Sequence, residues 1–130
     1  MTALAQRLVA HPKWRWERGM AVRTLHDSSA VVTAWHQHYG GHVHACGPSG
    51  IGDQEWDACD LTLDLEHPGT KGWLLHMLRE ATGTQDACAS WLGGEWRLYG
   101  WIGASALGRF PTEGAALAAA LLAVWNGGAS

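Results

Sequence analysis

Residues that can bind a metal ion are concentrated in one short stretch, "WHQHYGGHVHACG", at residues 35–47. The stretch holds four of the eight histidines in the chain and one of its three cysteines. Zinc sites in proteins use these side chains, through imidazole nitrogen and thiolate sulfur. The candidate ligands are His36, His38, His42, His44 and Cys46. Because residues two apart on a strand lie on the same face, a strand pair here could gather several of them.

The register of this strand pair decides whether the histidines share a face. If residues 40–41 form a two-residue turn, the histidines before the turn face away from the ligands after it, and no common site forms. If the loop has three residues, 39–41, all four histidines share one face. That register places four apolar residues on the opposite face: Val31, Trp35, Val43 and Ala45. Imidazoles that project in parallel from a flat sheet must tilt strongly to reach one ion. We therefore expect a polar hairpin and no cofactor, with a zinc-binding module as the alternative.

A second group of candidate residues lies in the acidic segment, residues 53–66, which carries six carboxylates and no lysine or arginine. Such a segment can dock on a basic surface of another protein, because complementary potentials steer association. The alternative is a solvated acidic loop. Two tryptophans among basic residues near the start of the chain are further interface candidates, because tryptophan is enriched at binding hot spots. The alternative for them is partial packing under a loop. The candidate partner-binding residues are Asp53, Glu55, Trp56, Asp57, Asp60, Leu61, Asp64, Trp14 and Trp16.

Charge and composition argue against several classes of function. The net charge is −3 and the isoelectric point about 6.2, whereas a nucleic-acid-binding domain usually has a basic face and a high isoelectric point. No stretch approaches the roughly 20 apolar residues of a membrane span, and the first residues lack the apolar core of a signal peptide. The serines and cysteines stand in no recognised catalytic motif. We expect a cytoplasmic protein that is not an enzyme and does not bind nucleic acid directly.

The elements that position these residues can be predicted from periodicity and turn signals. Leucines at helical spacing predict a helix over 70–81, which Gly83 can close and Thr70 can cap, and a second helix over 112–125. A shorter helix at the start carries Leu4 and Leu8 and stops at Pro12. Strands are expected near 20–26, 30–38 and 42–46, a loop or irregular edge over 47–60, and a hairpin of strands 87–92 and 95–101.

These elements predict a single α+β domain over residues 1–130. We expect an antiparallel sheet of about four to five strands packed by the helices 70–81 and 112–125, with the short N-terminal helix against an edge or the opposite face. The 130 residues fit one domain, and 47% hydrophobic residues are enough for a core.

Residues from about 60 to 125 resemble small proteins of bacteriophages and prophages. The resemblance is carried by "LDLEHPGTKGWLLHMLREATG", an aromatic hairpin and "PTEGAALAAALLAV". The same helix–hairpin–helix order occurs in the phage α-β-α sandwich domain. The resemblance implies an accessory phage protein in the cytoplasm of the bacterial host. Such a protein would bind a host protein, such as a component of host defence, in the manner of an anti-CRISPR inhibitor. The alternatives are the metal-binding module above and a self-associating structural protein of the virion, and a homo-oligomer is compatible with each.

Overall fold

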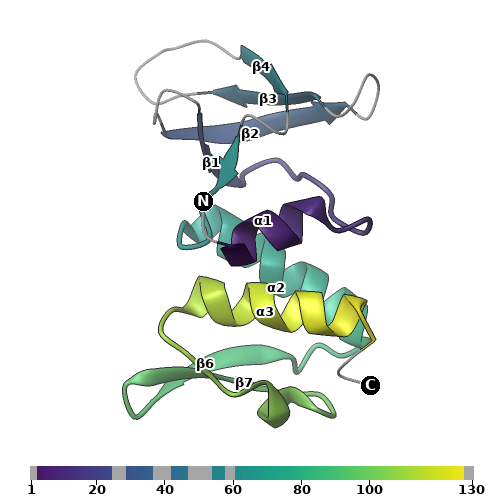
Figure 1. Cartoon of the computed structure of the whole chain (residues 1–130), viewed down its shortest axis with the longest axis vertical. Helices are drawn as coiled ribbons and strands as arrows, with labels where there is room; N and C mark the ends of the chain where they lie inside the picture. The colour runs from purple at the N-terminus through teal and green to yellow at the C-terminus, as the bar shows by residue number, and fades with distance from the viewer. Residues whose placement is uncertain (1–2, 25–28, 37–41, 47–53, 58–60, 128–130) are drawn as a thin grey trace.

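Two antiparallel sheets enclose a layer of helices (Figure 1). The structure, a computed structural model, describes residues 3–24, 29–36, 42–46, 54–57 and 61–127. The α-helices are α1 (Ala3–Ala10), α2 (Pro68–Thr82) and α3 (Glu113–Trp125), and a short 3₁₀ helix, η2, spans Ala104–Leu107. The mixture of helices and antiparallel strands confirms the α+β class predicted from the sequence.

The larger sheet has five strands in the order β4-β3-β2-β1-β5. They are β1 (Ala21–Arg23), β2 (Ser29–His36), β3 (His42–Cys46), β4 (Gln54–Asp57) and β5 (Thr62–Leu63). The first four pair with their neighbours in sequence, whereas β5 returns across the sheet and pairs with β1, with Val22 opposite Leu63. Strands β4 and β5 are close in the sequence, yet they form the two opposite edges of this sheet. The stretch 47–60, predicted as a loop or irregular edge, therefore contains an edge strand.

The smaller sheet has three strands in the order β6-β7-β8, which are β6 (Cys88–Leu92), β7 (Glu95–Tyr99) and β8 (Arg109–Phe110). The predicted aromatic hairpin is present, but it does not extend the first sheet. Helix α3 contacts α1 and α2 and also all three strands of the hairpin sheet, so it separates the two sheets (Figure 1). The prediction of a single sheet is thus corrected to two. The helix–hairpin–helix order predicted for residues 60–125 is present as α2, the β6–β7 hairpin and α3. These helices lie between the two sheets.

Local sequence explains both long helices. The side chain of His67 caps α2 by accepting a hydrogen bond from the Gly69 amide, Pro68 occupies the first turn, and Gly83 closes the helix with φ of 73°. The N-cap of helix α3 is Thr112, whose hydroxyl accepts a hydrogen bond from the Ala115 amide. The apolar faces of both helices are buried as predicted, at Leu74, Leu78, Leu117 and Leu121.

Thr70 has a different role from the predicted cap. It lies inside the first turn of α2, is completely buried, and its hydroxyl accepts a hydrogen bond of 2.9 Å from the Ala21 amide at the start of β1. Nearby, the Trp73 indole donates to the Arg18 carbonyl at 2.8 Å. These bonds fasten α2 to the chain that enters the five-stranded sheet, so the middle layer and that sheet are held together by polar contacts as well as by the core.

Candidate functional site

The histidine hairpin adopts neither of the two registers considered from the sequence. His36 pairs with His42, so the connection is the longer segment 37–41, which includes His38 and lies outside the described residues. A bulge at Thr33 then shifts the pairing, and Val31 lies opposite Cys46. One extra residue reverses which face the following residues use. Val31 is accordingly 37% exposed, although Val43 and Ala45 are buried, which corrects its predicted place beside them.

The metal site on the hairpin stays a prediction. The backbone of β2 and β3 places His36 directly across from His42, whereas the side chains of the histidines and Cys46 are not among those that the structure describes. Within the described part of the chain, no group of three or more histidine, cysteine, aspartate or glutamate side chains is placed to hold a metal ion. A zinc site on the hairpin stays the alternative hypothesis.

Trp14 and Trp16 are core residues rather than surface anchors. Their exposures are 9% and 5%, and their rings make an edge-to-face contact with centroids 5.5 Å apart. Both belong to the same buried cluster as Val32 and Val43 of the five-stranded sheet. The sequence prediction of an interface at these tryptophans is therefore corrected. The apolar face of the five-stranded sheet must be buried, and Trp14 and Trp16 pack against it as part of the core.

The acidic segment does not form one continuous ribbon. Its first part belongs to β4 and its last part to β5, at opposite edges of the same sheet. Trp56 lies on β4 and packs partly against the core, Asp57 is exposed, and Leu61 is 1% exposed. Leu61 is thus a core residue and not the predicted anchor. Asp53, Asp60 and the side chain of Glu55 lie outside the described residues.

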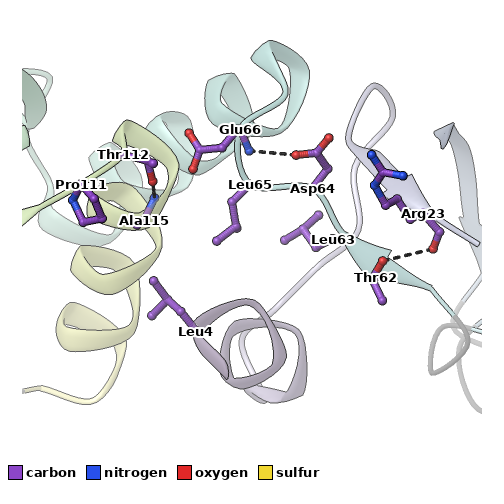
Figure 2. Close-up of a pocket in the computed structure, with 10 residues that line it drawn as sticks. All are labelled: Leu4, Arg23, Thr62, Leu63, Asp64, Leu65, Glu66, Pro111, Thr112 and Ala115. Carbon is purple, nitrogen blue, oxygen red and sulfur yellow. Dashed lines mark hydrogen bonds between the residues drawn. The ribbon is translucent and has the colours of Figure 1, made fainter. Parts of the chain in front are cut away.

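A cleft of about 790 Å³ opens where the acidic segment reaches β5 (Figure 2). It is bounded by Leu4 of α1, by Arg23 of β1, by residues 62–66 and by the first turn of α3. Leu4, Leu63 and Leu65 extend toward the space at its centre, and Pro111, Thr112 and Ala115 form the wall from α3. The cleft therefore has an apolar interior and a rim with charged side chains.

The cleft lies at the edge of strand β5 rather than over one face of the sheet. Successive residues of a strand point to opposite faces. Both sets of alternating residues, Thr62 and Asp64 on one side and Leu63 and Leu65 on the other, line the cleft. A space bordered by both sets must follow the edge of the strand.

The backbone of this edge has no strand partner among the described residues, although Leu63 is only 5% exposed and α1 packs beside β5. Strand β5 pairs with β1 alone, and the Asp64 amide donates to the Ala21 carbonyl at 2.9 Å. Because backbone groups alternate in direction along an antiparallel strand, those of Leu63 point away from β1. Backbone groups at a sheet edge can pair with an incoming segment. Such a segment would have to reach Leu63 through the cleft, because this residue is itself only 5% exposed.

The carboxylates at the rim are held in place by backbone amides. The Asp64 side chain accepts from the Glu66 amide at 3.0 Å, and the Glu66 side chain accepts from the Gly114 amide at 3.3 Å. The second bond satisfies one of the free N–H groups in the first turn of α3, where the helix dipole favours a negative charge. The two carboxylates are thus fixed at the mouth of the cleft, and Glu66 was not among the residues singled out from the sequence.

A separate polar cluster fastens the N-terminal segment to α2. Arg15 contacts Glu17 and Glu80, each at 2.9 Å, and His76 contacts Glu80 at 2.5 Å. The hydrogen bond from Arg15 holds the pKa of Glu80 below its ordinary value of 4.5. These side chains are partly exposed on the surface, so we assign the cluster a structural role.

Comparison with protein-family models, with curated proteins and with solved structures finds no match to this chain. The predicted relation to phage proteins therefore stays a prediction. Among the described residues, no helix combines the length and the apolar composition needed to cross a membrane.

Proposed function

We propose that this chain is a protein-binding domain without catalytic activity, and that it binds an extended segment of another protein in the cleft beside β5. The observation that carries the proposal is the coincidence of an edge strand, an apolar interior and fixed carboxylates in one cleft. Addition of a strand to an exposed sheet edge is a common mode of peptide recognition, in which the main chain provides affinity and side-chain pockets provide specificity.

Each part of the cleft selects a feature of the bound segment. The backbone groups of Leu63 favour an extended main chain. The space between Leu4, Leu65 and Ala115 favours a partner's apolar side chain. The volume of the whole cleft is within the usual range of roughly 300–1,000 Å³ for ligand sites. Asp64 and Glu66 favour lysine or arginine beside that apolar residue. We therefore propose an apolar residue next to basic ones as the recognised sequence.

A protein of a bacterial host remains the proposed source of that segment, and a defence component the proposed target. Support for a protein partner comes from the cleft, and support for a basic partner surface comes from its two rim carboxylates. The proposed docking surface is narrower than the acidic segment as a whole, because the carboxylates of β4 lie at the other edge of the sheet.

Selection from a library of random peptides tests this proposal. We expect the selected peptides to share an apolar residue flanked by lysine or arginine, and to shift the amide NMR signals of Leu63, Leu65 and Ala115. Binding should weaken as salt is added, because the rim charges are solvent-accessible. The substitution Ala115→Phe fills the cleft and should raise the dissociation constant by about tenfold or more.

The control is Ala119→Phe, one turn further along α3 and outside the cleft lining. Both alanines are partly buried, and circular dichroism establishes that both variants fold. Peptides that bind the Ala115→Phe variant as tightly as the unmodified protein, or that shift signals far from the cleft, would refute the proposed site.

A further inference from the structure

Strand β6 combines an open sheet edge with exposed apolar side chains. It is an edge strand of the three-stranded sheet, on the side away from β8. Trp91 is 57% exposed and Leu92 is 53% exposed, which makes them two of the few large apolar residues at the described surface. Tyr99, on the neighbouring strand β7 and paired with Cys88, is 40% exposed.

The sequence of β6 lacks the usual protection of an edge strand. Natural edge strands are commonly blocked by charged residues, proline or a bulge, which prevent pairing with another sheet. The strand reads "CASWL", without a charge or a proline, and its five residues pair with β7 in unbroken register. A five-residue uncharged edge of this kind is suited to pairing with another strand.

The turn before β7 determines which backbone groups of β6 point outward. Gly93 and Gly94 have φ of 65° and 85°, the positive values that a two-residue hairpin turn of type I′ requires. The residues that flank such a turn, Leu92 and Glu95, form a hydrogen-bonded pair, and pairs then alternate along the ladder. The N–H and C=O groups of Ala89 and Trp91 therefore point away from β7, toward the open edge.

This pattern is complementary to itself. When two copies of β6 lie antiparallel about a two-fold axis at Ser90, Ala89 of each strand is opposite Trp91 of the other. Those are the two residues with outward backbone groups, so both can exchange hydrogen bonds. The large indole also faces the smallest side chain of the strand, and Leu92 faces Cys88, so no like charges and no two bulky rings oppose each other.

We propose that the protein forms a symmetric homodimer through antiparallel pairing of β6 with β6 of a second copy, which joins the two three-stranded sheets into one sheet of six strands. A two-fold contact uses the same surface on both copies and closes the assembly at two chains. The pairing uses an edge of the three-stranded sheet, whereas the cleft lies beside β5 of the five-stranded sheet. The dimer can therefore form whether or not the proposed peptide site is correct.

A cross-link at the axis tests the register. In the proposed dimer Ser90 lies opposite the partner's Ser90 in a non-hydrogen-bonded pair, where Cα atoms are about 4.5 Å apart, a separation that a disulfide can span. Ser90→Cys, in a Cys88→Ala background, should form an intermolecular disulfide under mild oxidation. Arg109→Cys in the same background is the matched control, because Arg109 is on β8 at the opposite edge of the sheet and is also exposed. The control should remain uncross-linked.

Sedimentation equilibrium with EDTA present measures the assembly without metal. We expect twice the chain mass of 14.0 kDa, and we expect Leu92→Lys to raise the dimer dissociation constant about tenfold or more. Leu92 is half-exposed at the end of the strand, so this substitution leaves the monomer folded by circular dichroism. A monomeric unmodified protein, a dimer unaffected by Leu92→Lys, or equal cross-linking at positions 90 and 109 would overturn the proposal.

Discussion

Two glycines of α2 should respond in opposite directions to the same substitution. Glycine in a helix is about 1 kcal/mol less favourable than alanine, so Gly→Ala normally stabilises a helix. At Gly72 no atom lies within 4 Å of the position that a β-carbon would take. At Gly69 the β-carbon would overlap the carbonyl oxygen of Gly19 and would lie 3.2 Å from its carbonyl carbon.

The carbonyl of Gly19 cannot move aside without disturbing other contacts. The Gly19 amide donates to the Val32 carbonyl at 2.9 Å, and Gly19 has φ of 99°, a conformation that few other residues adopt. Overpacking at such a site costs about 1–3 kcal/mol. We expect Gly69→Ala to lower the free energy of unfolding by about 1–3 kcal/mol, and Gly72→Ala to raise it by up to about 1 kcal/mol.

Urea unfolding of the two variants and the unmodified protein measures this difference. In a chain of this size, 1 kcal/mol corresponds to a change in Tm of roughly 3–5 °C, so thermal unfolding provides a second readout. If Gly69→Ala is as stable as Gly72→Ala, the close packing of the α2 N-terminus against Gly19 is wrong.

Three further predictions concern the core, the polar cluster and the histidine hairpin. Leu78→Ala should lower the free energy of unfolding by about 2–5 kcal/mol in urea titrations, because Leu78 is completely buried, and a loss near zero would contradict its place in the core. The pKa of Glu80 is lowered in the folded state by its hydrogen bond with Arg15, so its ionised form stabilises the protein above pH 4.5, and this contribution is lost as the pH falls through the folded-state value. With Glu80→Gln, the free energy of unfolding should therefore fall slightly less as the pH is lowered. If the variant and the unmodified protein lose stability equally in acid, the ionised Glu80 side chain makes no such contribution. Treatment with EDTA should leave Tm unchanged if residues 35–47 hold no structural metal, whereas stoichiometric zinc in untagged protein would establish the metal-binding alternative.

The sequence predicted the helices well because their evidence is local. Leucine spacing and the terminal Gly83 define α2, and the helix differs from its predicted range by only a few residues. The hairpin register could not be predicted in the same way, because the pairing of His36 with His42 and the bulge at Thr33 both depend on how the whole strand fits its neighbour. One sequence pattern could have predicted β5. Leu61, Leu63 and Leu65 alternate with polar residues, as on a half-buried strand, and all three are buried in the structure.

The candidate site depended still more on contacts between distant parts of the chain. Acidic residues that are neighbours in the sequence separate to opposite edges of a sheet, and the cleft joins α1, β5 and the start of α3. The charge pattern indicated a binding surface but gave no information on which carboxylates would lie together. Similarly, the exposure of Trp91 follows from the position of β6 at a sheet edge, which depends on contacts between distant parts of the chain.

The late return of β5 to the far edge of its sheet also constrains the order of folding. Hairpins such as β2–β3 and β6–β7 join segments that are close in the chain, and they can form rapidly. Pairing of β1 with β5 must close a loop that contains three other strands, and its entropic cost delays it. Because β5 also forms one wall of the cleft, we expect the proposed peptide site to appear only in the last stage of folding. A partly folded or newly synthesised chain would then contain both hairpins and yet lack the proposed site.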